Sequence, residues 1–192
     1  INSGVVPIAL ALEMYGYEKF GESLVNNEDR PENYTKNGEY IIISGDKDLS
    51  KNAYEDYMKI QNQNPNGEKV KIIIGSETAS EGLDFSYIRE VHILEPWFHL
   101  NKIEQIIGRG IRNCSHIDLP YNKRKVKIFL YVSTLSENPK KDVESIDLEI
   151  YRKAELKHKQ IGKIEYIIKT NAVDCNLNIE TNKHFTDKDY QI

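Results

Sequence analysis

Blocks of hydrophobic and polar residues alternate along the first part of the chain and predict a helix, a loop and a strand. Residues 4–17 carry apolar side chains at helical spacing, and Gly16 favours a helix stop. Residues 20–37 are polar and include Pro31, which indicates a loop. Residues 39–46, EYIIISGD, contain a short continuous apolar run, which is typical of a strand buried on both faces.

The same alternation continues through the middle of the chain. Residues 48–63 predict a helix that the NPNG turn closes. Residues 69–85, KVKIIIGSETASEGLDF, read as an apolar strand followed by a loop of small residues. Residues 89–97 predict a third strand, stopped by Pro96. We therefore expect strands and helices to alternate.

The remaining elements are a short helix, a fourth strand and a charged helical region. Asn101 is predicted to cap the short helix, with Glu104 three residues later. Residues 124–134 predict the fourth strand. From Ser145 onward, an isoleucine stripe bordered by lysines predicts helix, and Gly162 interrupts that stripe, which leaves one or two helices open.

Alternating strands and helices indicate an α/β fold with a mostly parallel sheet and helices on both faces. Ligands bind to such sheets outside the carboxyl ends of the strands. In this chain, those ends are the loops that begin at Ser44, Gly75 and Glu95.

Composition narrows the class of protein. The 192 residues carry a formal net charge of −4, so a nucleic-acid partner would need a local basic patch. The two cysteines, Cys114 and Cys175, argue against a disulfide scaffold and for a reducing compartment. We expect no membrane span, since no apolar run approaches the roughly 20 residues required. The start lacks an initiator Met and a basic segment, so we expect a piece of a longer protein without a signal peptide.

Residues 105–112, QIIGRGIR, place two permanent cations on one face of the predicted helix. At about 100° per residue, Gln105, Arg109 and Arg112 share a narrow stripe because they are spaced i, i+4 and i+7. The isoleucines on the other side are expected to pack on the sheet: Ile103, Ile106, Ile107 and Ile111. By itself this arrangement fits either a ligand-binding face or a solvated basic face with surface ion pairs.

Two glycines interrupt the same helix. Each costs about 1 kcal/mol in a helix interior, so their presence indicates close approach by a ligand or by another backbone. Gly108 borders the polar face and Gly110 lies near the apolar one.

Three segments in this order resemble a known family. GSETASEGLDF, residues 75–85, followed by QIIGRGIR, resembles motifs V and VI of superfamily 2 helicases and translocases, with a complete Q-x-x-G-R-x-x-R pattern. SGD, residues 44–46, resembles the loop after the preceding strand in the second motor domain of that family. Nearly the whole chain is similar to helicase-like ATPases of nucleocytoplasmic large DNA viruses, which include the poxvirus early transcription factor small subunit and giant-virus relatives.

The resemblance implies a fold and a domain division. It implies a RecA-like helicase C-terminal domain of the P-loop NTPase superfamily in residues 1–135, lacking its first strand. Residues 136–192 would form a carboxy-terminal helical extension and a polar tail.

The resemblance also implies roles for individual residues. Arg112 corresponds to the arginine finger that reaches the γ-phosphate of ATP, with Arg109 beside it as a second catalytic arginine. Residues implied to lie near the nucleotide are Gln105, Gly82 and Asp84. Residues implied to face the nucleic-acid backbone are Ser76, Thr78 and Gly45. A forked guanidinium suits the spread charge of a phosphoryl transition state better than lysine does.

The chain contains no G-x-x-x-x-G-K-[ST] motif, and GSETASEG lacks the lysine of a P-loop. The resemblance therefore implies that ATP and Mg²⁺ are held mainly by the N-terminal RecA-like domain of the same protein. We expect the 192 residues alone to be inactive, and the whole protein to be an ATP-dependent helicase or translocase. The other implied partners are DNA or RNA and the viral transcription machinery, in the host cytoplasm and the virion.

Three alternative functions remain open at this stage. The whole protein could be a motor-derived subunit that binds partners without hydrolysing ATP. It could be a double-strand DNA translocase or a transcription termination ATPase, since these share motifs V and VI. It could also be a plain nucleic-acid-binding module, although the acidic net charge argues against that reading.

Two further groups of residues are weighed and set aside. Cys114 and His116, with Cys175 and His184 downstream, match no common zinc spacing, and no metal site is predicted. Trp97 and Phe98 follow a strand end, where core packing or contact with another domain is favoured over stacking on a base.

Overall fold

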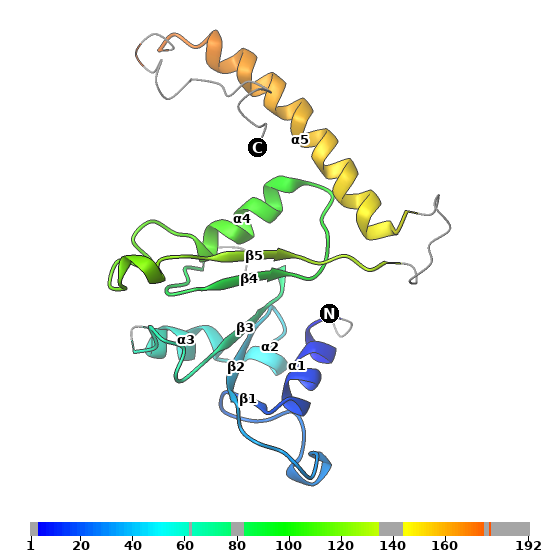
Figure 1. Ribbon diagram of the computed structural model, residues 1–192, viewed down its shortest axis with the longest axis vertical. Coiled ribbons are helices and arrows are strands. Elements are labelled where there is room, and N and C mark those ends of the chain that lie inside the picture. Colours follow the sequence, from blue (N-terminus) through cyan, green and yellow to red (C-terminus); the bar gives the residue numbers. More distant parts are fainter. Residues whose placement is uncertain (1–3, 62, 78–82, 135–143, 175–176, 178–192) are drawn as a thin grey trace. The chain divides into compact units, whose positions relative to one another are not determined.

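The computed structural model describes residues 4–61, 63–77, 83–134, 144–174 and 177 (Figure 1). Internal contacts divide the chain into two compact units, residues 1–91 with 105–129, and residues 92–104 with 130–192. The domain boundary expected near residue 135 stays a prediction.

The first unit contains a parallel three-stranded sheet, as the alternating pattern predicted. Its strands are β1 (Tyr17–Lys19), β2 (Gly38–Ile43) and β3 (Ile72–Gly75), in the order β1-β2-β3. Both neighbouring pairs are parallel. The sequence pattern did not indicate β1, because its three residues are too few to show alternation.

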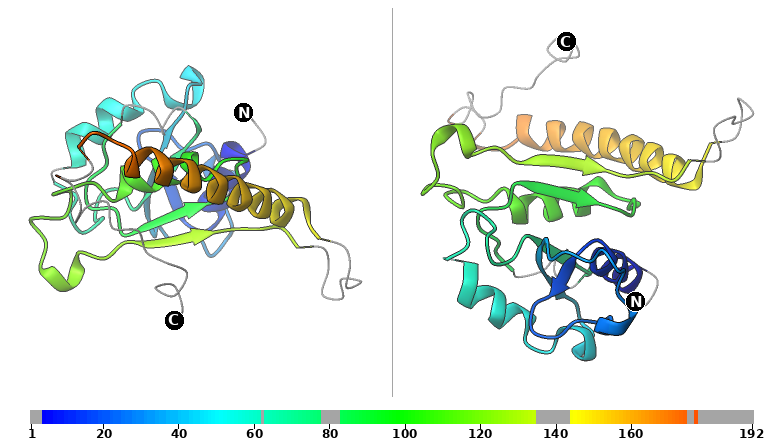
Figure 2. Two further views of the ribbon diagram at one scale, coloured as in Figure 1. Left: turned by 90° about the horizontal axis from the view of Figure 1, so that it is seen from above. Right: turned by 60° about the horizontal axis from the view of Figure 1, so that its bottom comes forward.

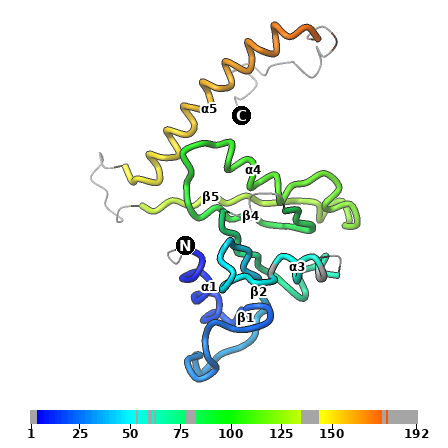
Figure 3. The backbone as a smooth tube through the Cα atoms, turned by 180° about the vertical axis from the view of Figure 1, so that it is seen from behind, coloured from blue at the N-terminus to red at the C-terminus, as the bar shows by residue number. Residues whose placement is uncertain are grey.

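Helices cover both faces of this sheet (Figures 2 and 3). The helices are α1 (Val5–Met14), α2 (Lys47–Ser50) and α3 (Ala53–Gln61), so the helix expected over residues 48–63 is broken into two. Successive β2 residues enter different cores: Ile41 packs in the cluster with Tyr57 of α3, whereas Ile42 packs in the cluster with Ala9 of α1. The prediction of a strand buried on both faces is confirmed.

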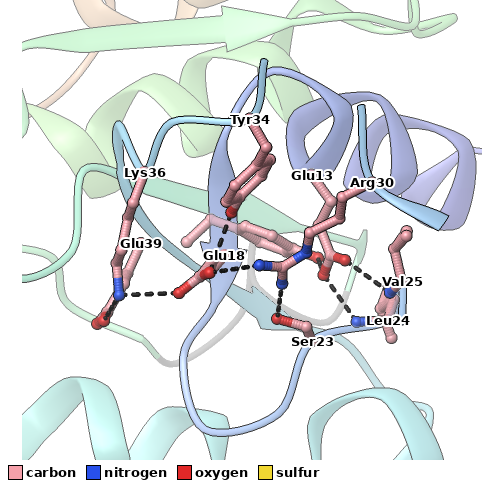
Figure 4. Close-up of polar contacts among 10 residues, drawn as sticks. Glu13, Glu18, Ser23, Leu24, Val25, Arg30, Tyr34, Lys36 and Glu39 are labelled. Carbon is pink, nitrogen blue, oxygen red and sulfur yellow. Dashed lines mark hydrogen bonds and ion pairs between the residues drawn. The ribbon is translucent and has the colours of Figure 1, made fainter. Parts of the chain in front are cut away.

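The polar segment between β1 and β2 is held on the inside by one buried carboxylate. Glu13, at the end of α1, has only 1% of its surface exposed. Its Oε1 accepts hydrogen bonds from the Leu24 N–H at 2.7 Å and the Tyr40 hydroxyl at 2.9 Å, and its Oε2 accepts one from the Val25 N–H at 2.7 Å (Figure 4). Because these three bonds satisfy both oxygens of the buried carboxylate, Glu13 fixes the start of the loop. The loop includes the short 3₁₀ helix η1 (Asn27–Asp29).

A second carboxylate holds the outer side of the same loop. Glu18 Oε1 accepts from Arg30 at 2.8 Å and from the Tyr34 hydroxyl at 3.0 Å, and its Oε2 lies 2.9 Å from Lys36 Nζ (Figure 4). The Arg30 guanidinium also lies 4.4 Å from the centroid of the Tyr34 ring. The hydrogen bonds from Lys36 and Arg30 lower the pKa of Glu18 to about 2.

The last two strands, β4 (Glu90–Ile93) and β5 (Lys127–Leu130), form a separate two-stranded sheet. The Lys127 N–H donates to Arg89 O at 2.9 Å, and the Tyr131 N–H donates to Ile93 O at 3.0 Å. From the first bond to the second, the residue number rises by four on both strands, so the two strands run parallel. The sequence predicts parallel pairing, but it does not indicate how many strands share one sheet. The 3₁₀ helix η3 (Tyr121–Lys123) precedes β5.

Two helices differ in detail from the sequence prediction. Helix α4 (Leu100–Gly110) begins before Asn101, which therefore lies inside the helix and does not cap it. Helix α5 (Ile146–Thr170) is one continuous helix through Gly162, with the Ser145 hydroxyl accepting from the Leu148 N–H at 3.3 Å as its cap. Among the described helices, none combines the length and the apolar composition that a membrane span requires.

Candidate functional site

The site is built around the carboxyl end of α4. Along this helix Ile103 is 4% exposed, Ile106 and Ile107 are half-buried, and Gln105 is exposed. The predicted division into an apolar and a polar face therefore holds for these residues. Ile111 is an exception with 47% exposure, because the helix ends at Gly110 and the chain turns away from the apolar face.

The two glycines of α4 have different surroundings. A Cβ added at Gly110 would lie 2.9 Å from Val91 Cγ2 and 3.2 Å from Ile88 Cγ2. A Cβ added at Gly108 would meet nothing within 4 Å. Gly110 thus lets the end of α4 approach Val91 of β4 and Ile88 just before that strand, whereas the space beside Gly108 is open to a ligand or another domain.

Arg109 and Arg112 converge on one carboxylate. Arg109 Nη1 lies 3.7 Å from Asp84 Oδ1, and Arg112 Nη1 forms an ion pair with the same oxygen. Arg109 Nη1 also donates to Leu83 O at 3.4 Å. Side-chain exposures of 29% for Arg109, 50% for Arg112 and 58% for Asp84 leave the group open to solvent. The surface ion pair weighed from the sequence is present, and it joins the arginines to a residue of the GSETASEGLDF segment.

The position of Asp84 is fixed by its neighbours in the chain. Leu83 and Phe85 both pack in the core cluster that contains Ile41, and Phe85 is 9% exposed. The Ser86 N–H donates to the Tyr57 hydroxyl at 3.0 Å. With both neighbours anchored, the Asp84 carboxylate has a defined place on the surface of the first unit.

Arg112 lies just past the end of α4 and not inside the helix as predicted. Its carbonyl accepts from the Ser115 N–H at 3.1 Å and from the Ser115 hydroxyl at 2.8 Å. His116 continues this arrangement, with Nδ1 2.8 Å from Ser115 Oγ and Nε2 2.6 Å from Ile88 O. A carbonyl only accepts, so Nε2 carries the proton. The sequence did not predict that His116 would link the turn after Arg112 to Ile88. The only signal for it was the position of His116 just after the arginines.

The residues expected to face nucleic acid lie at the carboxyl ends of β2 and β3. Gly45 is exposed and comes two residues after the end of β2. Ser76 is half-buried, and its N–H donates to Ile43 O at 3.0 Å. The structure therefore brings the Gly45 and Ser76 loops to the same edge of the sheet. Thr78 and Gly82 lie outside the described residues.

The remaining candidates of the sequence occupy the surface. Trp97 and Phe98 are 39% and 53% exposed and form an edge-to-face pair, with Lys102 Nζ 4.2 Å from the Trp97 centroid. Within the second unit they are therefore not core residues. No group of three or more potential metal ligands occurs in the described part of the chain. Cys175 and His184 lie outside that part.

Comparison with known proteins identifies the fold to which this site belongs. Residues 23–114 match the model of the helicase conserved C-terminal domain, which includes Gly45, Asp84 and both arginines. These residues form a helicase C-terminal domain. The predicted α/β class and the RecA-like helicase resemblance are confirmed.

Relatives of this helicase domain come from large DNA viruses. A protein of Invertebrate iridescent virus 3 named as a helicase, 087L, is 36% identical over 94% of this chain and 18% of its own length. A protein of Acanthamoeba polyphaga mimivirus named as an ATP-dependent RNA helicase, L377, is 32% identical over 83% of this chain and 14% of its own length. A termination factor NPH-I homolog of African swine fever virus is 29% identical over 73% of this chain and 20% of its own length. The chain thus spans less than a quarter of each of these relatives.

Proposed function

We propose that this domain is the carboxy-terminal motor domain of an ATP-dependent nucleic-acid helicase or translocase of a large DNA virus, with Arg112 as its arginine finger. The observation that carries the proposal is the exposed convergence of Arg109 and Arg112 at the end of α4, within a helicase C-terminal domain. Both guanidiniums carry a permanent positive charge at this solvent-open position, and a phosphate is a suitable partner for them.

The group fits a nucleotide triphosphate in its chemistry. Guanidiniums present N–H donors in a planar fork and stay charged at every working pH, which suits phosphoryl oxygens. Half of the Arg112 side chain is exposed, so it can meet a ligand held outside this domain. Helicases use ATP and Mg²⁺, and a Walker motif is absent from these 192 residues. We therefore assign the holding of ATP and Mg²⁺ to an N-terminal RecA-like domain and only the arginines to this chain.

Gln105 and Asp84 are proposed to lie near the nucleotide, and Gly45 and Ser76 near the nucleic-acid backbone. Gly45 and Ser76 belong to loops at the carboxyl edge of the parallel sheet, where ligands of such folds bind. Backbone N–H groups and hydroxyls contact phosphates without reading bases, which suits a motor that acts on any sequence.

A role in viral transcription is supported by the relative named as a termination factor. That name also favours an alternative function, a double-strand translocase or termination ATPase, over a helicase that separates strands. The relative L377 is named as an ATP-dependent RNA helicase, which favours a helicase that separates strands.

The test uses the full-length protein that carries this domain. ATP turnover is measured alone and with single-stranded DNA, duplex DNA and RNA, beside a strand-separation assay and a triplex-displacement assay. A helicase is expected to show stimulated turnover and to separate strands. Triplex displacement without strand separation would select the translocase, and unstimulated or absent turnover would contradict a motor function and select a binding subunit.

A further inference from the structure

We propose that the segment leading into β5 carries a second binding surface, which takes single-stranded nucleic acid. This surface, which we call the basic patch, consists of Arg89, Tyr121, Lys123, Arg124, Lys125 and Lys127. The proposal rests on the function proposed above, because a nucleic-acid motor meets this ligand, but it uses none of the residues assigned there. Apart from Arg89, the patch lies beyond residue 114, where the match to the helicase domain model ends.

The basic patch supplies the local positive charge that a chain of net charge −4 needs in order to bind nucleic acid. Four of the five residues from 123 to 127 are Lys or Arg, and all four are exposed. Within the described part of the chain, Lys123 and Lys125 form no ion pair with a carboxylate. Lys127 Nζ lies 3.8 Å from Glu90 Oε1, with side-chain exposures of 72% and 45%. Such an exposed pair is weak, so Lys127 stays available to a phosphate.

The two arginines of the basic patch are held by neutral acceptors. Arg124 Nε donates to Leu119 O at 2.8 Å, and its Nη2 donates to Ile117 O at 2.7 Å. Arg89 Nη1 donates to Lys123 O at 2.7 Å, which ties the segment to the residue before β4. A carbonyl oxygen orients a guanidinium without cancelling its charge. Both arginines therefore present a positive charge whose position is already fixed, which lowers the entropic cost of binding a phosphate.

Tyr121 places an aromatic ring beside these charges. It is 87% exposed, and the Arg124 N–H donates to its carbonyl at 3.1 Å, which closes the turn of η3. Residues three apart in a 3₁₀ helix lie above one another, so Tyr121 and Arg124 share one side. An exposed ring among cations suits an unpaired base that stacks on the ring while its phosphate meets a cation. The ring therefore favours single-stranded nucleic acid over a duplex or an acidic peptide.

Lys125 and Lys127 extend the basic patch along the chain that enters β5. Both are exposed, and Val126 between them is half-buried, which is the alternation of an extended segment. Side chains two residues apart in such a segment lie on the same face, about 7 Å apart at roughly 3.3 Å per residue. A row of cations of this kind follows a sugar–phosphate backbone without reading its sequence.

The test uses the full-length protein and fluorescein-labelled single-stranded DNA, single-stranded RNA and duplex DNA of equal length, with binding followed by fluorescence anisotropy across a salt series. The variant Lys123→Gln with Lys125→Gln removes two exposed charges. For single strands, the slope of log K against log salt should become shallower by about 1.4, since each phosphate contact contributes about 0.7. The dissociation constant at physiological salt should rise on the order of tenfold by the same relation. ATP turnover without nucleic acid should stay unchanged.

Tyr121→Ala tests the stacking separately from the charge. The dissociation constant for both single strands should rise by at least about fivefold, while the salt slope stays unchanged because stacking releases no counterions. The affinity for the duplex should not change. An equal loss on the duplex would contradict stacking on an unpaired base.

The matched control is Lys157→Gln with Lys163→Gln, which removes the same charge from two exposed lysines of α5. Because distant exposed charges are screened at physiological salt, the dissociation constant should change by less than about twofold and the salt slope should stay the same.

Three results would overturn the basic patch alone. The first is an unchanged affinity and salt slope in Lys123→Gln with Lys125→Gln, while the wild type binds nucleic acid and shows stimulated ATP turnover. The second is an equal loss in the α5 control, which would reduce the effect to overall charge. The third is an equal loss of affinity for polyglutamate, used as a competitor, which would indicate a site for any polyanion. A wild-type protein that binds no nucleic acid would contradict the proposed function as well, so the two failures are distinguishable.

Discussion

The close approach of α4 to the start of β4 gives a prediction about stability. In Gly110→Ala, the new Cβ would lie 2.9 Å from Val91 Cγ2 and 3.2 Å from Ile88 Cγ2. Overpacking of this kind costs about 1–3 kcal/mol. Alanine recovers up to about 1 kcal/mol of helix propensity, and less at Gly110, the last residue of α4. We therefore expect the free energy of unfolding to fall by about 1–2 kcal/mol.

Gly108→Ala is the matched control on the same helix. Its Cβ would meet nothing within 4 Å, and Gly108 lies inside α4. No steric clash offsets the better helix propensity of alanine, so the free energy of unfolding should rise by about 0.5–1 kcal/mol. The two variants should then differ by about 2 kcal/mol, or roughly 1 M in the urea midpoint at a typical m-value. Equal shifts of both variants in one direction would refute the packing argument.

Three further predictions concern the loop before β2 and the cap of α5. Glu13→Ala leaves three donors without their acceptor, so urea unfolding should show a loss of about 2–4 kcal/mol, and a loss below 1 kcal/mol would be contradictory. Glu18 has a folded pKa of about 2, below its ordinary 4.5, so it stabilises the fold above pH 4.5 and this contribution is lost as the pH falls toward 2. Thermal melts between pH 6 and pH 2 should therefore fall less steeply in Glu18→Gln than in the unaltered chain; parallel curves would show that the cluster contributes nothing. Ser145→Ala removes the hydroxyl that accepts from Leu148 N–H and should cost about 1 kcal/mol in the same urea assay, whereas an unchanged midpoint would mean that the cap is not formed.

Much of the fold follows from local patterns in the sequence. The apolar run at residues 39–46 predicted β2, and the structure buries its residues on both faces as expected. Local patterns did not show β1, whose three residues pair only because β2 lies beside them. They left open whether α5 continues through Gly162, and it does, because about 1 kcal/mol of helix propensity cannot end a helix of 25 residues with a good cap.

The candidate site could be predicted in its parts but not in its contacts. Helical spacing placed Gln105 and Arg109 on one face of α4, and Gly110 near the packed one. It also placed Arg112 in the helix, which ends before it. The pairing of both arginines with Asp84 joins segments more than twenty residues apart, so it depends on tertiary packing. The roles assigned to Gly45, Ser76 and Gln105 stay predictions.

The central claim, that Arg112 acts as an arginine finger, is tested most directly by the kcat of nucleic-acid-stimulated ATP turnover in full-length Arg112→Ala. Arg152→Ala is the matched control, because Arg152 is similarly exposed and paired with Glu144, and its side chain belongs to α5. The account predicts a loss on the order of 10³-fold for Arg112→Ala, the lower end for such fingers in GTPases, and turnover near wild type for Arg152→Ala. Stimulated turnover within about threefold of wild type in a folded Arg112→Ala protein would contradict it.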